Sequence, residues 1–500
     1  MKIIIQAGGR GSRLEGLTLN KPKCLVAINN LPIIFHLFKK FPDSEFTVIA
    51  DYQIDVLEKY LKTFAKSYSY KIIKAPKEGT ISGIKEALED VSDTDKFMII
   101  WCDLILGDNF KLPSDNNNYI GISCDFECRW SYIDNKFIKT PTKDHGVAGL
   151  FIFKNKKELE DIELSGAFVN WLSKKNIRFR ELNLSGTKEI GTLLSYSDNN
   201  SAIPRHRVFN KFEFLDDIVI KSPADEQGRK IALDEINWYK HIQGLKFDNI
   251  PKIYEFEPIK MKRVQGKNIF EYENLTTLQK KEIIKKITDT IKTLHTLEPE
   301  QPANIDDCYN IYYKKTFERL SVVENLIPFI DKEFIKINSR YYKNPLFCKD
   351  EIKAAIEANY PDKFNLIHGD TTFSNIMFDL FDEKVVLIDP RGYFGNTKLY
   401  GDRCYDWAKL YYSINGGYDN FNRKKFNLKI NENDVEFSIH KNDWADMEEF
   451  FFENLPDINK YKIKLLHGLI WLSLTTYAWE DYDSILGAFY QGVIKLNEIF

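Results

Sequence analysis

Three side chains in the second half of the chain have types and a spacing that suit phosphoryl transfer. Asp370 and Asn375 lie five residues apart in "NLIHGDTTFSNIMFD", and Asp389 follows fourteen residues later at the end of "VVLID". A carboxylate can orient an attacking hydroxyl, while an amide oxygen and a second carboxylate can bind the Mg²⁺ that accompanies nucleotide phosphates. Turn formation is the alternative explanation for each residue alone, but the combined spacing favours a catalytic role.

A second candidate site lies at the start of the chain, where an apolar run leads into a glycine-rich loop, "IIIQAGGRGSRL". Glycines let the backbone approach a phosphate closely, and their amide groups can form an anion-binding nest. The loop is neither a dinucleotide fingerprint, which needs a third glycine at the right place, nor a P-loop. Arg13 and Lys23 add two cations beside it, which favours phosphate binding over a simple strand-to-helix turn.

Length and composition limit the scaffolds that can position these residues. A chain of 500 residues is too long for one core, so two or three domains are expected. The net charge of −3 gives no general attraction to nucleic acid or anionic membranes. No apolar run has the length of a membrane span. The seven scattered cysteines indicate reduced thiols, so we expect a cytoplasmic protein without membrane insertion.

The first part of the chain has the alternation of an α/β domain. Short apolar runs such as "KIIIQA", "FTVIA", "YKIIKA" and "KFMIIWCD" are separated by amphipathic stretches such as "QIDVLEKYLKTFAK" and "ISGIKEALEDV". Strands that alternate with helices predict βαβ units around a parallel sheet. The polar stretch "SYSDNNSAIP" then marks a domain boundary. We therefore predict a Rossmann-like α/β domain over residues 1–198.

Residues 199–500 have a different pattern, which predicts a two-lobed α+β domain. A small lobe, residues 205–268, contains a hairpin about an Asp-Asp turn, the helix "ALDEINWYKHIQ", and a second strand pair. The large lobe, residues 269–500, is mainly helical, and one face of its first helix collects Ile283, Ile287, Ile291 and Leu294. A strand-rich island within it, residues 364–390, carries the three polar residues described first.

Five motifs in the expected order make the first 195 residues resemble the sugar-phosphate and choline-phosphate nucleotidyltransferases. They are "QAGGRGSRL...NKPKCLVAINNLPI", "EGTISGIKEAL", "FMIIWCDLIL", "HGVAGLFIF" and "KEIGT". The resemblance implies a nucleotide site formed by Ala7, Gly8, Gly9, Gly11, Gly79 and Thr80. It implies that Arg13 and Lys23 neutralise phosphate charge during catalysis. It also implies that Asp103 and Glu189 bind Mg²⁺, with Glu189 standing where the family usually has Asp.

One departure from that family bears on the substrate. Many sugar-phosphate members carry a Glu-Lys-Pro segment that contacts the sugar, whereas the comparable region here reads "SYIDNKFIKTP". The predicted domain is also short. Both features favour a small phosphorylated alcohol over a hexose phosphate as the acceptor. CTP is the nucleotide expected with such an acceptor, and UTP or another NTP is the alternative.

The second half of the chain resembles the aminoglycoside phosphotransferase and choline kinase family. The resemblance rests on "IHGDTTFSNIMFD...VVLIDPRG", on "YGDRCYDWAKL", and on a strand lysine followed by a helix glutamate. It implies that Asp370 is the catalytic base and that Asn375 and Asp389 bind Mg²⁺. It also implies that Lys221 binds the phosphates of ATP and that Glu235 holds Lys221. No glycine loop is recognisable in "AIPRHRVFNKF", which leaves open what covers the phosphates.

Aromatic and acidic residues are concentrated in two C-terminal stretches, "YGDRCYDWAKLYY" and "GLIWLSLTTYAWEDYD". Because aromatic faces attract cations, these residues could form a cage for an ammonium head group. The candidate substrate contacts are Asp402, Asp406, Trp407 and Trp479. Packing in the helical core is the alternative explanation for most of the aromatic residues.

Together the two resemblances predict a bifunctional enzyme with Mg²⁺ as its cofactor. The second domain would phosphorylate choline, ethanolamine or another amino alcohol or polyol with ATP. The first domain would then transfer CMP from CTP to the product, giving a CDP-activated precursor for capsule or surface polysaccharide.

Two other interpretations stay open. In one, a sugar kinase is joined to a sugar-1-phosphate nucleotidyltransferase that makes a nucleotide sugar. In the other, one domain is a non-catalytic nucleotide sensor. The sequence is compatible with a homo-oligomer, and no nucleic-acid partner is expected.

Overall fold

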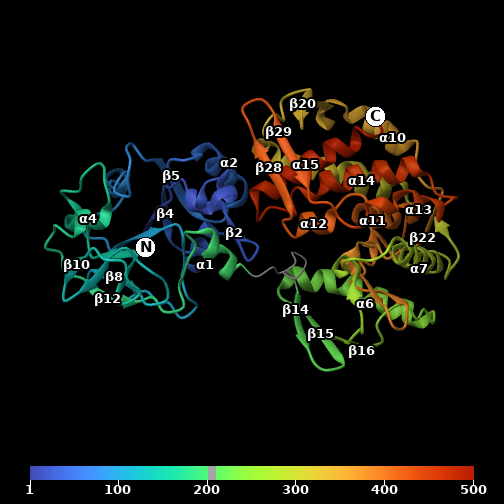
Figure 1. The fold of residues 1–500 in the computed structure, drawn as a ribbon, viewed down its shortest axis with the longest axis horizontal. Coiled ribbons are helices and arrows are strands. Elements are labelled where there is room, and N and C mark those ends of the chain that lie inside the picture. Colours follow the sequence, from blue (N-terminus) through green and yellow to red (C-terminus); the bar gives the residue numbers. More distant parts are fainter. Residues whose placement is uncertain (201–209) are drawn as a thin grey trace. The chain divides into compact units, whose positions relative to one another are not determined.

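The chain forms two compact units, of which a computed structural model describes residues 1–200 and 210–500 (Figure 1). The first unit comprises Met1–Ala202 together with a short later segment, Trp479–Asp483. The second unit comprises the remainder of the chain, Ile203–Ala478 and Ser484–Phe500.

The domain boundary expected from the sequence, between residues 198 and 199, comes just before residues 201–209. The end of "SYSDNNSAIP", most of "AIPRHRVFNKF" and the start of the expected small lobe fall on those nine residues and lie outside the described part of the chain. The grouping of Trp479–Asp483 with the first unit had no signal in the local sequence pattern.

The first unit is built around a nine-stranded mixed sheet. Its centre is parallel, because β1 (Lys2–Gln6) lies between β4 (Glu45–Ala50) and β6 (Phe97–Trp101), and β5 (Ser69–Lys74) pairs with β4. These four strands are the apolar runs that predicted a parallel sheet, and that prediction is confirmed. On the other side of β6 the sheet continues, in part antiparallel, with β8 (Tyr119–Ser123), β9 (Ser131–Ile133), β10 (Lys136–Ile138), β11 (Gly146–Phe153) and β12 (Arg180–Asn183).

The helices of the first unit follow the predicted amphipathic stretches only in part. α2 (Ile54–Phe64) forms as expected and buries Leu57, Tyr60 and Leu61. α3 (Ile84–Leu88) is shorter than "ISGIKEALEDV" indicated, because Gly83 just before it has a left-handed φ of 83°. The other helices are α1 (Ile33–Lys40), α4 (Phe168–Leu172) and α5 (Leu193–Asn199).

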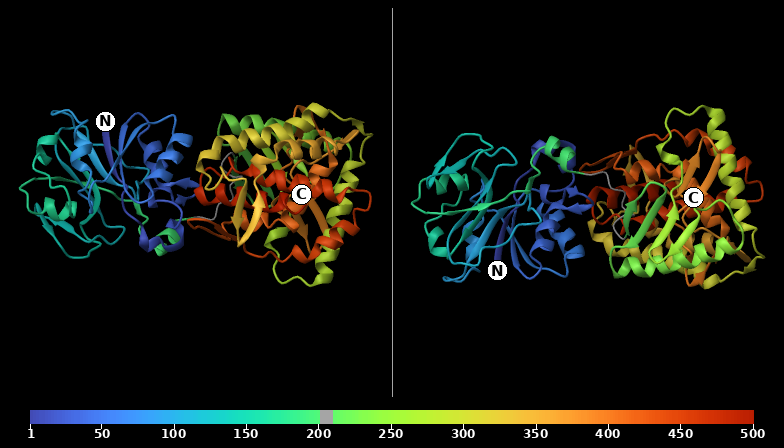
Figure 2. Two further views of the ribbon diagram at one scale, coloured as in Figure 1. Left: turned by 90° about the horizontal axis from the view of Figure 1, so that it is seen from above. Right: turned by 90° about the horizontal axis from the view of Figure 1, so that it is seen from below.

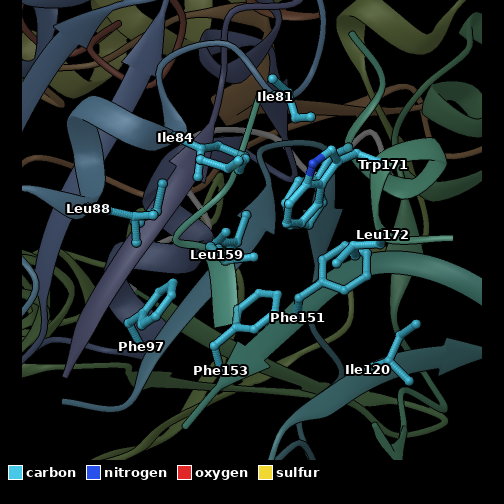
Figure 3. Close-up of a cluster of buried hydrophobic side chains, with 14 of the residues drawn as sticks. Ile81, Ile84, Leu88, Phe97, Ile120, Phe151, Phe153, Leu159, Trp171 and Leu172 are labelled. Atoms are coloured by element: carbon cyan, nitrogen blue, oxygen red, sulfur yellow. The ribbon is translucent and has the colours of Figure 1, made fainter. Parts of the chain in front are cut away.

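A hydrophobic cluster fills the space between this sheet and the helices α3 and α4 (Figure 3). Phe97 of β6 and Phe151 and Phe153 of β11 are fully buried in it, together with Trp171 and Leu172 of α4. Burying an aromatic or aliphatic side chain of this size stabilises a fold by roughly 1.5–3 kcal/mol. The cluster therefore holds β6 firmly, and the candidate metal ligand Asp103 follows directly after that strand.

The small lobe of the second unit has the predicted elements. A four-stranded antiparallel sheet runs in the order β14-β15-β17-β16, and α6 (Glu226–Gly244) lies beside it (Figures 1 and 2). Asp225 caps that helix by accepting a hydrogen bond from the Gly228 N–H. The strands are β14 (Asn210–Phe214), β15 (Ile218–Pro223), β16 (Ile253–Phe256) and β17 (Ile259–Lys262).

The remainder of the second unit is mainly helical, as predicted, around the expected strand-rich island. In α7 (Thr277–His295) the predicted apolar face is buried. The other helices are α8 (Ile305–Tyr309), α9 (Lys315–Val323), α10 (Lys349–Glu357), α11 (Arg403–Ile414), α12 (Tyr418–Asn422), α13 (Glu448–Glu453), α14 (Lys460–Leu474) and α15 (Tyr482–Leu496). The strands of the island are β22 (Lys363–Leu366), β23 (Ile376–Asp379) and β24 (Lys384–Leu387).

A second four-stranded sheet in this unit was not predicted. It consists of two hairpins, and its strands are β20 (Phe334–Ile337), β21 (Arg340–Lys343), β28 (Phe426–Ile430) and β29 (Val435–Ile439). The first hairpin turns at Asn338 and Ser339, which both have a positive φ, as two-residue hairpin turns require. Across residues 1–200 and 210–500, no helix has both the length and the apolarity needed to cross a membrane.

Two candidate active sites

The glycine-rich loop follows the carboxyl end of β1. Ala7 is buried and donates its N–H to the carbonyl oxygen of Ile49, 2.8 Å away. Gly11 has a φ of 67°, and a Cβ placed there would lie 3.0 Å from Cβ of Lys23. Gly11 therefore lets the loop fold closely over Lys23, whereas Gly8 and Gly9 are not required by backbone conformation.

The predicted base-contacting segment lies beside the end of the same strand. The side-chain amide of Gln6 donates hydrogen bonds to the carbonyl oxygens of Thr80 and Ser82, at 2.7 and 3.2 Å. Gly79 has a φ of 100°, and a Cβ there would lie 2.2 Å from the carbonyl oxygen of Gly166. The structure thus brings the exposed Gly79–Thr80 segment next to the strand that leads into the glycine-rich loop.

A charged cluster of Lys23, Asp103 and Glu189 lies in the same region. Nζ of Lys23 is 2.5 Å from Oδ2 of Asp103. The short strand β7 (Leu104–Ile105) pairs with β13 (Lys188–Glu189), so that Glu189 lies opposite the residue after Asp103. Lys23 and Asp103 are 80 residues apart in the chain, and Asp103 and Glu189 are 86 apart. The fold therefore brings three separate motifs together. Arg13 is exposed on the loop and acts electrostatically on Glu189.

The opposite charges in this cluster change the pKa values of its members. Burial alone would lower the pKa of Lys23, but the carboxylate of Asp103 outweighs it, and the pKa of Lys23 is raised. Burial and the nearby negative charge of Asp103 raise the pKa of Glu189 above its usual value. Two carboxyl groups this close favour a bound cation, because each disfavours the ionised form of the other.

The donor set fits Mg²⁺. Oδ1 of Asp103 is buried and has no hydrogen-bond partner among the described residues. Buried polar atoms normally have a partner, so an orphaned carboxylate oxygen beside a second carboxylate suits a hard cation that prefers oxygen ligands. Asp103 and Glu189 are the residues that would hold the ion.

A second charged cluster joins the two lobes of the second unit. Nζ of Lys221, on β15, lies 2.8 and 2.7 Å from the carboxylate oxygens of Glu235 on α6. The same nitrogen lies 2.8 Å from Oδ1 of Asp389, which follows β24. Burial would lower the pKa of Lys221, but the two carboxylates outweigh it and the pKa is raised. The expected pairing of Lys221 with Glu235 is therefore present.

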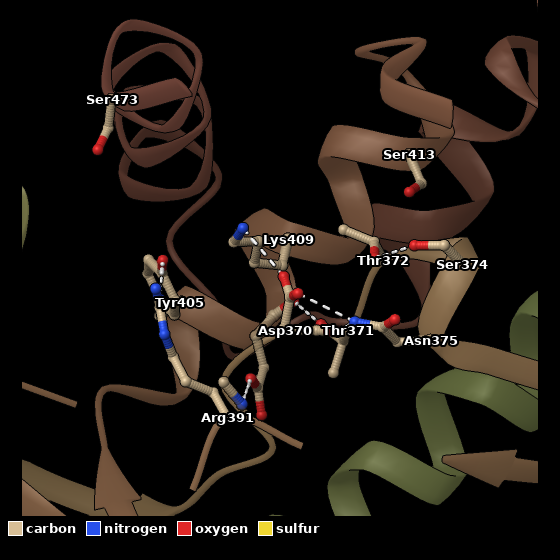
Figure 4. A network of polar contacts seen from close by, with 12 residues as sticks. Asp370, Thr371, Thr372, Ser374, Asn375, Arg391, Tyr405, Lys409, Ser413 and Ser473 are labelled. Atoms are coloured by element: carbon tan, nitrogen blue, oxygen red, sulfur yellow. Dashed lines mark hydrogen bonds and ion pairs between the residues drawn. The ribbon is translucent and has the colours of Figure 1, made fainter. Parts of the chain in front are cut away.

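Asp370 lies in a loop that many hydrogen bonds hold (Figure 4). The side-chain nitrogen of Asn375 donates to both the backbone oxygen and Oδ2 of Asp370, each at 2.9 Å. Because both bonds use the nitrogen, the amide oxygen is the atom that suits a metal ion. The ring of His368 packs against Trp238, and its Nε2 lies 3.0 Å from the carbonyl oxygen of Ile388. His368 thus supports the loop that carries Asp370.

Three of the expected substrate contacts have structural positions instead. Asp406 is fully buried and accepts hydrogen bonds from the backbone N–H groups of His368 and Gly369, at 3.0 and 2.7 Å. Asp402 is buried and pairs with Lys462. Trp407 is 1% exposed and packs against a histidine ring in the helical core. Because these three side chains are buried and already have partners in the protein, their positions favour structural roles, and a role in substrate binding stays a prediction.

The fourth expected contact, Trp479, is also placed differently. It groups with the first unit, where its ring centroid lies 5.5 Å from that of Phe35 and 5.8 Å from that of Phe64. Rings at such separations contribute about 0.5–1.5 kcal/mol beyond their buried area. Core packing, the alternative considered for the aromatic residues, describes Trp479 better than a substrate cage.

A large pocket in the second unit has the size of a nucleotide site. Its volume is about 970 Å³, and its apolar lining includes Phe212, Val219, Met261 and Met377. The segment Met261–Asn268 lines it as well. Asp389 is part of the lining, so the pocket reaches the Lys221 cluster.

The cations beside Asp370 belong to none of the predicted catalytic or binding residues. Nζ of Lys409 lies 3.0 Å from Oδ1 of Asp370, and Arg391 donates a hydrogen bond to the hydroxyl of Tyr405 at 2.9 Å (Figure 4). Burial would raise the pKa of Asp370, but Lys409 and Arg391 outweigh it and the pKa is lowered. The only local signal was their place in "DPRG" and "YDWAKL", next to the motifs already identified.

Comparisons with known proteins concern the first unit. Residues 3–109 match the family model of the MobA-like NTP transferase domain. The chain is 34% identical over 123 residues to a mannose-1-phosphate guanyltransferase of Saccharomyces cerevisiae, a match that covers 23% of this chain and 34% of the relative. It is 31% identical over 115 residues to the bifunctional protein GlmU of Methanocaldococcus jannaschii, covering 22% of this chain and 27% of the relative. The chain thus spans about a third of the length of these curated relatives.

Solved structures are similar over the same part of the chain. HddC from Yersinia pseudotuberculosis has a TM-score of 0.34 and 20% identity, covering 40% of this chain and 97% of that chain. A CTP:phosphocholine cytidylyltransferase from Streptococcus pneumoniae has a TM-score of 0.32 and 17% identity, covering 39% and 96%. Residues 3–109, in the N-terminal part of this chain, are therefore similar to the MobA-like NTP transferase domain.

Proposed function

We propose that the chain catalyses two consecutive reactions. The second unit phosphorylates a small alcohol with ATP, and the first unit transfers a nucleotidyl group to the phosphorylated product. The observation that carries the proposal is the presence of two separate charged clusters, Lys23–Asp103–Glu189 and Lys221–Glu235–Asp389, each beside a loop whose motifs suit phosphate chemistry.

In the first reaction, Asp370 accepts the proton of the alcohol while its oxygen attacks the γ-phosphorus of ATP, and ADP leaves. The lowered pKa of Asp370 keeps it ionised and able to accept the proton. Lys221, held by Glu235, binds the α- and β-phosphates. Asn375 and Asp389 would hold the Mg²⁺ that neutralises phosphate charge.

In the second reaction, a phosphate oxygen of the product attacks the α-phosphorus of an NTP, and pyrophosphate leaves. Both reactants are anions, so the step depends on charge neutralisation more than on acid–base chemistry. Lys23 and Arg13 supply the positive charge from the protein, and the glycine-rich loop supplies backbone amides. Asp103 and Glu189 would hold the Mg²⁺.

The nucleotide and the final use of the product are part of the proposal. We propose CTP as the donor, which yields a CDP-linked alcohol of the kind used to modify surface polysaccharide. A second candidate for the first unit is transfer to a hexose 1-phosphate, favoured by the names of its relatives, mannose-1-phosphate guanyltransferases. GTP therefore belongs in any test of the donor.

The experiment is a paired assay on the purified full chain with Mg²⁺. ATP is supplied with a panel of alcohols, and ADP release is measured. CTP, UTP or GTP is then added in separate arms, and pyrophosphate and the nucleotidyl product are measured, the latter by mass spectrometry. Mannose 1-phosphate without ATP tests the second candidate. The proposal fails if ADP is not released with any alcohol, or if pyrophosphate is not released in any arm.

A further inference from the structure

The second unit contains a strongly basic pocket next to Asp370. Its volume is about 80 Å³, and four of its lining residues are basic: Lys315, Arg319, Arg391 and Lys409. Among the described residues that line it, none is acidic. Lys409 pairs with Asp370, but the described part of the chain provides no carboxylate within ion-pair distance of the other three cations. An uncompensated group of cations is unfavourable unless an anion binds to it.

The aromatic residues around the pocket do not form a cage for an ammonium ligand. The guanidinium of Arg319 lies 4.3 Å from the ring centroid of Tyr477. Nζ of Lys409 lies 5.9 and 5.7 Å from the ring centroids of Tyr405 and Tyr412. These aromatic faces already interact with the protein's own cations. A cationic substrate such as choline would meet the positive charges of Arg319, Arg391 and Lys409 here, which argues against the amino alcohol expected from the sequence.

The basic pocket is separate from the nucleotide-sized pocket, because the two have no lining residue in common. Asp389 is one of the residues that line the nucleotide-sized pocket. Lys409 lines the basic pocket, and its ammonium group contacts Asp370. The attacking hydroxyl must lie beside Asp370. The basic pocket, which adjoins Asp370 through Lys409, is therefore on the side where the alcohol binds.

We propose that this pocket binds the alcohol that is phosphorylated, and that this alcohol is a small hydroxylated oxyanion carrying a carboxylate or a phosphate group. The inference rests on the proposed function and adds the substrate class. Arg319 and Arg391 bind the oxyanion, since guanidinium groups pair well with carboxylate and phosphate. Lys409 and Asp370 face the hydroxyl.

Two further properties of the pocket support this class of substrate. Burial and the charges of Arg391, Arg319 and Lys409 lower the pKa of Lys315 to about 6, which is the response of an amine that lacks a counter-ion. A bound oxyanion relieves that repulsion. The pocket volume is only several times the roughly 10–15 Å³ that one water needs, which favours a compact acid over an oligosaccharide.

The proposed reaction balances without any further reactant. The hydroxyl group of the oxyanion loses its proton to Asp370, its oxygen forms a bond with the γ-phosphorus of ATP, and the bond from that phosphorus to the bridging oxygen of ADP breaks. The carboxylate or phosphate already present on the substrate takes no part in bond formation. The product then carries a new phosphate group, which the first unit can use.

The test compares compounds of similar size and different charge. D-glycerate and glycerol 3-phosphate represent the two oxyanions, glycerol is the neutral control, and ethanolamine and choline are the cationic controls. ADP release by the full chain is measured with ATP and Mg²⁺, and binding of each compound is measured by calorimetry. We expect kcat/KM for at least one oxyanion to exceed that for glycerol and for both amines by about tenfold or more.

Variants assign the effect to the pocket. Arg319→Gln and Arg391→Gln should each raise KM for the preferred oxyanion about tenfold or more, with a smaller change in kcat. Arg319→Lys keeps the charge and should lose less. Lys332→Gln removes an exposed lysine elsewhere in the same unit and should leave KM unchanged. Circular dichroism and thermal unfolding of each variant show whether it is folded.

The outcomes separate this inference from the proposed function. ADP release that is fastest with choline, ethanolamine or glycerol overturns the inference and leaves the two-step reaction standing. Binding of an oxyanion that Arg319→Gln weakens, without ADP release from any compound, supports the pocket assignment and overturns the kinase activity. If neither oxyanion binds or is phosphorylated, or if Arg319→Gln and Lys332→Gln behave alike, the inference is wrong.

Discussion

The ammonium nitrogen of Lys409 lies 3.0 Å from a carboxylate oxygen of Asp370, and the two residues come from different parts of the chain, a loop and α11. The pair gives the proposed base a positive neighbour on one side, while Asn375 donates to its other oxygen. The base is therefore ionised at neutral pH and fixed in orientation.

Asp370→Asn should lower kcat for ADP release about 10²–10⁴-fold, because an amide cannot accept the proton of the attacking hydroxyl. Pyrophosphate release from an NTP and a ready-made phosphorylated product should stay at the wild-type rate. Asp382→Asn, which changes an exposed aspartate near the same loop, is the matched control and should leave both rates unchanged. ADP release at the wild-type rate from Asp370→Asn would mean that Asp370 is not the base.

Asp103→Asn should have the reverse pattern. It removes the carboxylate that contacts Lys23 and holds the orphaned oxygen, so pyrophosphate release should fall about 10²-fold or more, while ADP release stays unchanged. Asp95→Asn, at an exposed position ahead of β6, is its control. The same pair of assays tests the sensor alternative: a unit that tolerates its substitution without loss of either activity is not catalytic.

Gly11→Ala should destabilise the first unit by about 1–2 kcal/mol, because a residue with a Cβ is strained at a φ of 67°. The added Cβ would also lie 3.0 Å from Cβ of Lys23, which must shift. Gly9→Ala is the control for stability, since a Cβ there has no atom within 4 Å and its φ is not in the left-handed region. Chemical unfolding of both variants gives the free energies, and equal values would contradict the role assigned to Gly11.

Binding of D-glycerate to the basic pocket should weaken as pH rises from 7 to 9. Lys315 has a pKa of about 6 in the free protein, so it is mainly neutral in this range. The bound carboxylate favours its charged form, so binding takes up a proton, and the affinity falls by up to about tenfold per pH unit. The groups around Lys315 that bear on this titration are Asp307, Glu318, Arg319, Arg391, Tyr405, Lys409 and Tyr477.

Calorimetry in buffers of different ionisation enthalpy measures the proton uptake directly, and Lys315→Met should abolish it. The same group affects stability with the opposite sign. Its folded-state pKa lies below the usual 10.5, so the unfolded chain binds more protons between pH 6 and 10.5, and this contribution to the free energy of unfolding falls as pH is lowered through that range. An affinity that does not change with pH would show that Lys315 does not contact the anion.

The helices and strands that could be predicted are those whose local sequence pattern matches their burial in the fold. The three central parallel strands of the first unit, β1, β4 and β6, are continuous apolar runs, which is the pattern expected of strands buried on both faces. The sheet of β20, β21, β28 and β29 was missed because its two hairpins lie about 90 residues apart, so its pairing leaves no local signal.

The sequence by itself determined which residues could do chemistry. The types and spacing of Asp370, Asn375 and Asp389, and the glycines before Lys23, predict phosphate chemistry, because carboxylates, amides, cations and backbone amides are the groups that bind Mg²⁺ and phosphate. Motif spacing also placed Lys221 fourteen residues before Glu235, on elements that could pair them.

Only the tertiary structure decided the charge around the acceptor. The aromatic and acidic residues of the C-terminal stretches suggested an ammonium cage, but a linear pattern does not show which helix face is buried. Folding directs Asp402 inward to pair with Lys462 and Asp406 inward to hold the backbone at Gly369, and it brings cations from α9, α11 and the loop after β24 to one pocket. Coulomb interactions depend on distance in space, so the sign of that pocket is a property of the fold.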